Sequence, residues 1–280
     1  MLQRSPSLPL RHALALGLAQ GPTELLPVSS SAHTALIPAL LGWPYAELDG
    51  ELRKSFEVAL HAGAGVALAI DMCGELIEAA ARLERRRAAV IALSLAPAAI
   101  AGLSLRAPIE RRLGGPRSIA AGLVGGGLAM ALADGRPGPG DRSERDAGAR
   151  DGLALGLAQA VALIPGVSRH GATLTAARAR GFARGDAHTL SWHAGLPVML
   201  GASALKAARL ARNGTPPGAA APLAVAAAGA FLSTLLGARL LRRPSHARRA
   251  LLPYSLYRCA LAALVLARLR AGGTANAEQI

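Results

Sequence analysis

Leu14-Ala-Leu-Gly-Leu-Ala-Gln20 occurs twice in this sequence, and its second copy is Leu153-Ala-Leu-Gly-Leu-Ala-Gln159. Each copy continues within several residues into a proline and hydroxyl residues, as Pro27-Val-Ser-Ser-Ser31 and as Pro165-Gly-Val-Ser168. A shared heptapeptide with a similar continuation predicts an internal duplication. Apolar runs broken by proline or glycine at matching places in two halves are typical of discontinuous helices that meet at a midplane site in a membrane.

The most loop-like segment of the chain separates the two copies. It is rich in proline, glycine and charged residues, which disfavour a helix and favour contact with water. We therefore predict a first repeat over 1–135, a polar linker loop over 136–149 and a second repeat over 150–280, all within one membrane domain. Irregular backbone at membrane depth must be buried in protein or line a cavity. Two re-entrant helical hairpins are therefore expected, around 13–42 and around 152–180.

The composition favours closely packed membrane helices. The 280 residues are 52% hydrophobic but only 3% aromatic, so small residues supply much of the apolar surface. Uncharged runs cover 88–105, 152–168 and 213–238, and the first and last of these are long enough to span a bilayer. Further apolar stretches, each short or interrupted, cover 25–46, 58–70, 118–133, 187–205 and 250–267. The sequence thus predicts an all-α polytopic integral membrane protein.

The net charge of +14 comes largely from arginine clusters that lie between the apolar stretches. Such positions favour solvated loops and contacts with lipid headgroups over nucleic-acid binding. We therefore expect membrane lipids as partners and no nucleic acid. A basic soluble nucleic-acid-binding protein is the least favoured hypothesis. Because arginines flank 88–105 on both sides, the positive-inside rule gives no orientation.

Gln20 and Glu24 are the first pair of residues that indicates chemistry. They are four residues apart on one helical face, so both side chains can point into one cavity. A carboxylate within apolar sequence usually has a partner or a function, and with an amide oxygen it can bind a divalent cation. The alternative for Glu24 is a helix-end residue near water.

A serine run and a histidine follow this pair. Ser29, Ser30 and Ser31 precede His33, so hydroxyls and an imidazole lie within one or two helical turns. This combination can support nucleophilic attack or general acid and base catalysis. By itself the pattern is weak, because serine runs cap helices more often than they catalyse reactions.

The second polar segment, Pro165-Gly-Val-Ser-Arg-His-Gly-Ala-Thr173, indicates an anion site. It combines a guanidinium and hydroxyls with glycine at the predicted start of a helix. Arginine binds phosphate through two parallel hydrogen bonds, and amides at a helix N-terminus complete such a site. A diphosphate fits this pattern best, whereas the alternative for Arg169 is a headgroup or loop contact.

The sequence resembles the bacitracin-resistance family of undecaprenyl-diphosphate phosphatases. The resemblance rests on Gln20-Gly-Pro-Thr-Glu-Leu-Leu-Pro-Val-Ser-Ser-Ser-Ala-His33 and on Pro165 to Thr173. Weaker agreement at 56–63, 196–202 and 254–258 extends it over most of the chain. Two departures are His170, where the family usually has serine, and Pro22, which replaces a more usual leucine. A histidine at position 170 is expected either to add a proton carrier or to crowd the phosphate.

This resemblance implies two interlocked inverted-topology repeats and a multi-pass protein of the bacterial plasma membrane. The implied reaction is hydrolysis of undecaprenyl diphosphate to undecaprenyl phosphate and inorganic phosphate. It recycles the lipid carrier of peptidoglycan synthesis and confers bacitracin resistance. The implied substrate is thus a polyprenyl diphosphate lipid, the implied cofactor is Mg²⁺ or Ca²⁺, and a homodimer is compatible with the sequence.

Roles carry over to matching positions only. The resemblance implies catalytic roles for Glu24, Ser30, His33 and Arg169. Glu24 and Gln20 would bind the cation, or Glu24 would position water, while Ser30 and His33 would serve attack and proton transfer. The diphosphate would be held by Ser29, Ser168, Arg169 and Thr173.

A lipid-phosphate transporter or flippase is the alternative function. Inverted repeats with broken midplane helices are also typical of transporters. A transporter needs an anion site, but it needs no hydroxyl and histidine beside a metal-binding carboxylate. The residues alone leave both functions open, and this chemical difference is the feature that would discriminate between them.

Overall fold

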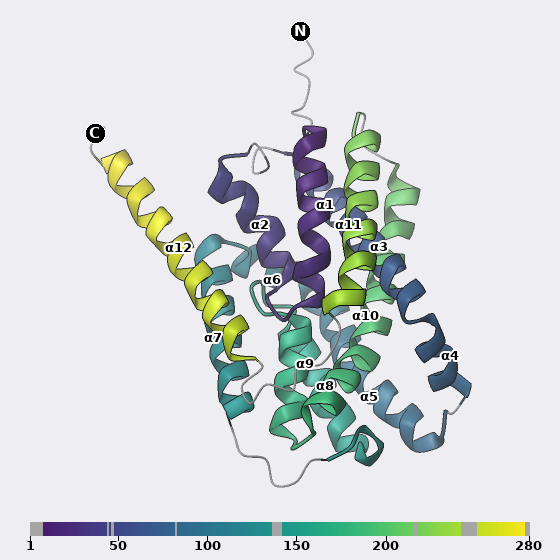
Figure 1. Ribbon diagram of the computed structural model, residues 1–280. Coiled ribbons are helices and arrows are strands. Elements are labelled where there is room, and N and C mark those ends of the chain that lie inside the picture. Colours follow the sequence, from purple (N-terminus) through teal and green to yellow (C-terminus); the bar gives the residue numbers. More distant parts are fainter. Residues whose placement is uncertain are drawn as a thin grey trace. The chain divides into compact units, whose positions relative to one another are not determined.

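The computed structural model describes residues 8–43, 45, 48–81, 83–135, 142–214, 218–241 and 251–277 (Figure 1). Residues 136–141 of the predicted linker lie outside these ranges. Within them the only β-type pairing is an isolated bridge between Arg142 and Phe182, so the predicted all-α class is confirmed. The helices are α1 Leu10–Leu25, α2 Ser30–Leu41, α3 Gly50–Asp71, α4 Cys73–Ala81, α5 Arg85–Ser104, α6 Arg106–Leu113, α7 Pro116–Gly135, η1 Glu144–Asp146, α8 Ala149–Val161, α9 Arg169–Ala179, α10 Arg184–Asn213, α11 Ala220–Leu241 and α12 Leu252–Ala277.

Four helices of the described chain are long and apolar enough to cross a membrane. They are Arg85–Ser104, Pro116–Gly135, Ala220–Leu240 and Leu252–Ala271, and each overlaps an apolar stretch predicted above. Large apolar side chains on these helices are exposed, which suits contact with lipid but not with water. They include Ile100, Leu103, Leu132, Leu236 and Leu240. The chain is therefore a multi-pass membrane protein, as predicted.

The start of one predicted apolar stretch differs from the start of the helix that contains it. The uncharged run begins at Asn213, but the apolar helix α11 begins only at Ala220. Gly214 and Gly218 have φ of +77° and +76°, which lie outside the right-handed helical region. Left-handed glycines of this kind end one helix and separate it from the next. The lack of charge predicted the apolar stretch, whereas backbone conformation set its start.

The chain divides into two compact units, each built from separate segments of sequence. Unit 1 comprises the described residues of Met1–Leu26, His33–Leu83 and Leu196–Arg243. Unit 2 comprises those of Pro27–Ala32, Glu84–Gly195 and Pro244–Ile280. The serines that begin α2 thus belong to the same unit as α8 and α9.

In unit 1, α11 packs against both α1 and α3 (Figure 1). Glycine allows the close approach of α1 and α11, because a Cβ atom on Gly17 would lie 2.6 Å from the carbonyl oxygen of Ala226. The core of the unit around this contact is apolar. It includes Leu16, Phe56, Leu60, Leu223 and Ala230.

In unit 2, α8 packs against α5, α7 against α12, and α9 against both α7 and α8 (Figure 1). Gly156 on α8 corresponds to Gly17 in the repeated heptapeptide, and its Cβ would clash with the carbonyl oxygen of Leu93 on α5. Helix α1 of the first half therefore packs on α11 of the second, while α8 of the second half packs on α5 of the first. This reciprocity is consistent with the predicted interlocked repeats.

Asp151 binds the polar segment that precedes α8. Its carboxylate accepts hydrogen bonds from Arg142 at 2.9 Å, from Arg180 at 2.7 Å and from the Gly148 N–H at 2.9 Å. Burial by itself would raise the pKa of this carboxyl group, but these hydrogen bonds outweigh burial and lower the pKa to about 2. The end of the linker is thereby held to the start of α8 and the end of α9.

Candidate active site

The two predicted hairpins are two helix pairs with short connections. Residues 26–29 connect α1 to α2, and residues 162–168 connect α8 to α9. Each connection contains a proline, which cannot donate a backbone hydrogen bond and so favours a break in the helix. These pairs are consistent with re-entrant hairpins, and they position every site residue predicted from the sequence.

Gln20 and Glu24 form a buried pair on α1. Nε2 of Gln20 donates to Oε2 of Glu24 at 3.1 Å, and the two residues are only 1% and 7% exposed. Oε1 of Gln20 is also buried and has no hydrogen-bond partner among the described residues. A buried carbonyl-type oxygen without a donor is destabilising unless a ligand satisfies it.

His61 on α3 lies beside this pair, a residue to which the sequence assigned no role. Its Nδ1 is 2.8 Å from the carbonyl oxygen of Glu57, so Nδ1 carries a proton and donates it. Its Nε2 lies 4.0 Å from Oε2 of Glu24. In the neutral ring this nitrogen presents a lone pair near a carboxylate, an arrangement that a proton or a cation would stabilise.

These groups fit a hard divalent cation. Glu24 and Gln20 offer oxygen ligands, and the Gln20 oxygen lacks a donor. Across the described chain, no group of three or more histidine, cysteine or acidic residues forms an all-protein metal cage. Mg²⁺ typically uses one or two carboxylates and completes its shell with water and substrate phosphates, so a sparse set of this kind suits it.

The start of α2 has a strained backbone. Ser29 precedes the helix with φ of +77°, the only positive φ at a non-glycine residue in the described ranges. Its hydroxyl lies 3.3 Å from that of Ser31, and the residue is 3% exposed. Ser30 is half-buried at the first position of the helix, and His33 is buried one turn later. Strained backbone of this kind often marks a functional site.

The start of α9 presents an arginine and an N-cap serine. Oγ of Ser168 accepts a hydrogen bond from the Gly171 N–H at 3.1 Å, as an N-cap residue does. Arg169 is the first residue of the helix, is half-buried, and donates from Nη1 to the carbonyl oxygen of Gly195 at 3.2 Å. A guanidinium at a helix N-terminus favours an anionic ligand.

Thr173 and His170 point toward α10 instead. Oγ1 of Thr173 is fully buried and contacts the hydroxyl of Ser191, and it also donates within α9. Nδ1 of His170 lies 2.8 Å from Oγ of Ser191, and its ring packs on that of Trp192 at 4.7 Å. The histidine that departs from the expected serine is therefore a packing and hydrogen-bonding residue between α9 and α10.

Arg258 on α12 is a buried arginine that the sequence did not single out. It is 0% exposed, and its guanidinium donates to four backbone carbonyls. Two of these belong to α7, at Leu123 and Gly122. The other two are Pro27, in the connection from α1 to α2, and Gly166, in the connection from α8 to α9. One guanidinium thus joins both connections.

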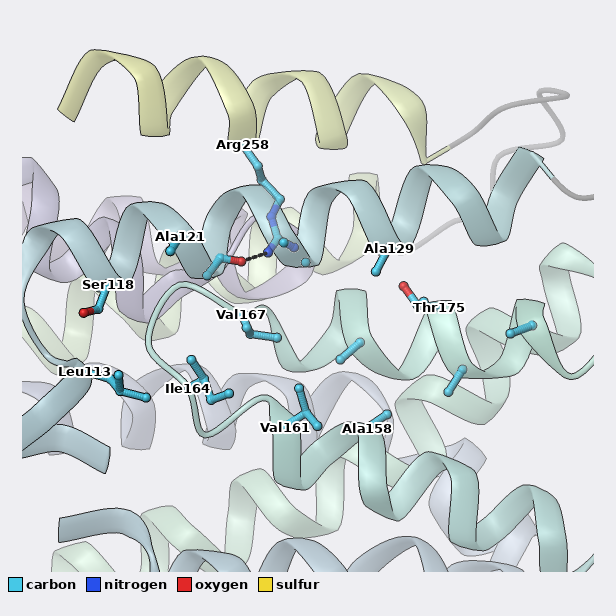
Figure 2. Close-up of a pocket in the computed structure, with 16 residues that line it drawn as sticks. Leu113, Ser118, Ala121, Ala129, Ala158, Val161, Ile164, Val167, Thr175 and Arg258 are labelled. Atoms are coloured by element: carbon cyan, nitrogen blue, oxygen red, sulfur yellow. Dashed lines mark hydrogen bonds between the residues drawn. The ribbon is translucent and has the colours of Figure 1, made fainter. Parts of the chain in front are cut away.

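A cavity of about 620 Å³ lies beside this arginine, between α7, α8 and α9 (Figure 2). Its walls are mainly small and apolar, and Arg258, Ser118 and Thr175 are its polar members. None of the site residues predicted from the sequence lines it among the described residues. Such a lining suits hydrocarbon, not a diphosphate.

Comparison with known proteins agrees with these motifs. A family model described as "Bacitracin resistance protein BacA" matches residues 13–264. The chain belongs to the BacA family. It is 41% identical over 272 residues to a protein of Geobacter sulfurreducens named undecaprenyl-diphosphatase. The aligned region covers 93% of this chain and 98% of that protein. A Geobacter metallireducens protein of the same name is 40% identical over 271 residues, covering 91% and 96% respectively.

No role was predicted from the sequence for His61 or Arg258, which lie in two stretches of weaker resemblance, 56–63 and 254–258. Each is an ionisable side chain within apolar sequence, and in a membrane protein that is a signal of function. The stronger signal for both, proximity to Glu24 and to the two connections, exists only in three dimensions.

Proposed function

We propose that this protein hydrolyses undecaprenyl diphosphate to undecaprenyl phosphate and inorganic phosphate in the bacterial plasma membrane. The observation that carries the proposal is family membership over residues 13–264, with relatives named undecaprenyl-diphosphatase. The start of α9 supports it, because the Arg169 guanidinium at a helix N-terminus suits a phosphate group. Carrier recycling for peptidoglycan synthesis and bacitracin resistance follow from this activity.

The reaction breaks the anhydride bond between the two phosphorus atoms. An oxygen nucleophile forms a new bond to the terminal phosphorus, and undecaprenyl phosphate leaves with the bridging oxygen. When water attacks directly, His33 accepts its proton. When Ser30 attacks first, His33 accepts the hydroxyl proton of Ser30 and water then hydrolyses the phosphoserine, so both routes release one inorganic phosphate. Trapping of a labelled phosphoprotein in wild type and its loss in Ser30→Ala would select the second route.

The binding roles follow the positions on the helices. Ser29 and Ser168 supply hydroxyls at the starts of α2 and α9, and Arg169 supplies the guanidinium that neutralises phosphoryl charge. Thr173 was expected to contact the diphosphate. Because its hydroxyl is already bonded within α9 and to Ser191, we propose that it supports the first turn of α9.

Glu24 and Gln20 are proposed to bind Mg²⁺ or Ca²⁺. A bound divalent cation offsets negative charge on a transferring phosphoryl group. Glu24 would supply a carboxylate oxygen, oriented by the hydrogen bond from the Gln20 amide. We also propose a homodimer, which light scattering of the detergent-solubilised protein would test.

Phosphate release from undecaprenyl diphosphate by detergent-purified protein tests the proposal. We expect cation-dependent release in wild type, loss in Glu24→Ala and Arg169→Ala, and normal release in Arg268→Gln, whose side chain is exposed on α12. No release from folded wild type with Mg²⁺ or Ca²⁺ would overturn the phosphatase. A Glu24→Gln protein that still moved lipid diphosphate unhydrolysed would instead support a transporter.

A further inference from the structure

We infer that Arg258 is a positioning residue for phosphoryl transfer, which holds the two substrate-binding connections at a fixed separation. The inference rests on the proposed function for its reaction, but its geometry stands alone. Arg258 donates from Nη1 to the Pro27 carbonyl at 3.2 Å and from Nη2 to the Gly166 carbonyl at 3.0 Å. These two residues are far apart in sequence, and each lies just before a helix start that carries candidate diphosphate ligands.

The consequence for the helix starts follows from chain connectivity. Pro27 is two residues before Ser29 and three before the first residue of α2. Gly166 is two residues before Ser168 and three before Arg169, the first residue of α9. Two or three residues leave little freedom between a fixed carbonyl and the side chain that follows. The guanidinium therefore sets the places of both helix N-termini within unit 2.

Arg258 is also hydrogen-bonded to α7. It donates from Nε to Leu123 and from Nη2 to Gly122, both at 3.2 Å. Arginine has a planar fork of five N–H donors, and a lysine ammonium cannot reproduce that spread of directions. Only an arginine at this position can bond α7 and both connections at once.

Gly126 on α7 makes room for the guanidinium. A Cβ atom on Gly126 would clash with Nη2 of Arg258 and lie 3.2 Å from its Cζ. A Cβ on the adjacent Gly125 would have nothing within 4 Å. The pair offers a matched test, since Gly126→Ala displaces an unchanged arginine and Gly125→Ala makes the same substitution in the same helix without displacement.

The partners of Arg258 among the described residues are neutral carbonyls. Removing it deprives the buried carbonyls of Pro27 and Gly166, which lie outside helices, of the guanidinium donor, so Arg258→Gln is expected to lose stability as well as activity. Arg258→Lys keeps the charge, and Gly126→Ala keeps the arginine itself. These two variants therefore distinguish positioning from charge and from folding.

The experiment measures kcat and KM for phosphate release, together with the thermal unfolding shift produced by inorganic diphosphate. We expect kcat to fall about 100-fold in Gly126→Ala and in Arg258→Lys, as for a misplacement of about 1 Å. KM should rise as well, and the unfolding shift produced by inorganic diphosphate should shrink, because the candidate diphosphate ligands Ser29, Ser168 and Arg169 directly follow the two connections. Gly125→Ala and Arg268→Gln should match wild type in both constants.

The outcomes separate this inference from the proposed function. Wild-type kcat in both Gly126→Ala and Arg258→Lys overturns the positioning role while the phosphatase stands. A fall in kcat that only parallels the loss of folded protein also overturns it. If wild type releases no phosphate but diphosphate raises its unfolding temperature, and Gly126→Ala loses that shift, the phosphatase fails, while the role of Arg258 in positioning the two diphosphate-binding connections stands. Absence of both release and shift in folded wild type overturns both.

Discussion

Nε2 of His61 on α3 lies 4.0 Å from Oε2 of Glu24 on α1, while Nδ1 of the same ring donates to the Glu57 carbonyl. Nε2, the ring nitrogen that does not donate to Glu57, therefore faces the carboxylate of Glu24. This relationship places a second titratable group beside the candidate cation site, and it suggests how the site is tuned.

Substitution of His61 should weaken the cation site. Residues that orient a metal ligand typically contribute 10–100-fold to metal affinity, so we expect His61→Gln to raise the Mg²⁺ concentration for half-maximal phosphate release by about tenfold. His193→Gln, which alters a histidine near Glu144, is the control. An unchanged Mg²⁺ dependence in His61→Gln would contradict the role.

Glu24→Gln should separate activity from stability. The amide keeps the shape of the side chain but removes a buried charge, and we expect phosphate release to fall about 100-fold or more. Because a neutral amide is less costly to bury, the free energy of unfolding should stay equal or rise by about 1 kcal/mol. A large loss of thermal stability would show that Glu24 is chiefly structural.

Ser29 allows strain and hydroxyl chemistry to be measured separately. Its φ of +77° suits glycine, so Ser29→Gly should be more stable than Ser29→Ala by about 1 kcal/mol. Both variants lack the hydroxyl, and KM for the lipid diphosphate should rise by a similar factor in each. The diphosphate-binding role would be wrong if Ser29→Gly kept the wild-type KM.

Substituting the glycine in either copy of the repeated heptapeptide should lower the stability of the protein by a similar amount. A methyl group on Gly17 or Gly156 meets the backbone of the facing helix, so each alanine variant should lose about 1–3 kcal/mol of stability. A Cβ on Gly102 has nothing within 4 Å, and Gly102→Ala should be neutral or gain up to about 1 kcal/mol. Thermal unfolding in detergent measures all three, and a stable Gly17→Ala would contradict the close approach of α1 and α11.

Low pH should lower the stability of the folded protein, because Asp151 becomes protonated. Its pKa is about 2 in the folded chain against an ordinary value of 3.8, so its ionised form contributes about 2 kcal/mol of stability above pH 4. That contribution should be lost as pH falls from about 4 toward 2. Asp151→Asn should be less stable than wild type at pH 7, and the difference should shrink in acid. A constant difference across this pH range would contradict the assignment.

Much of the fold, and the site residues at the start of α9, could be predicted from local sequence. The spans of α5, α7, α11 and α12 overlap apolar stretches of the sequence, because hydropathy is a property of contiguous residues. Ser168 and Arg169 were expected at a helix start and are found there, since N-cap preferences act within a few residues. The direction of the Thr173 hydroxyl, toward Ser191, depends on a helix that begins later in the chain.

Local sequence patterns are enough to predict that this protein is helical, enters a membrane and carries two polar breaks of matching composition. The contacts of His61 with Glu24, and of Arg258 with Pro27 and Gly166, arise only when the helices pack. The two kinds of feature differ in the sequence separation over which their interactions act. Helix formation and burial in lipid depend on neighbours within a turn or a span, whereas a buried arginine is defined by the carbonyls that packing brings within reach of its five donors.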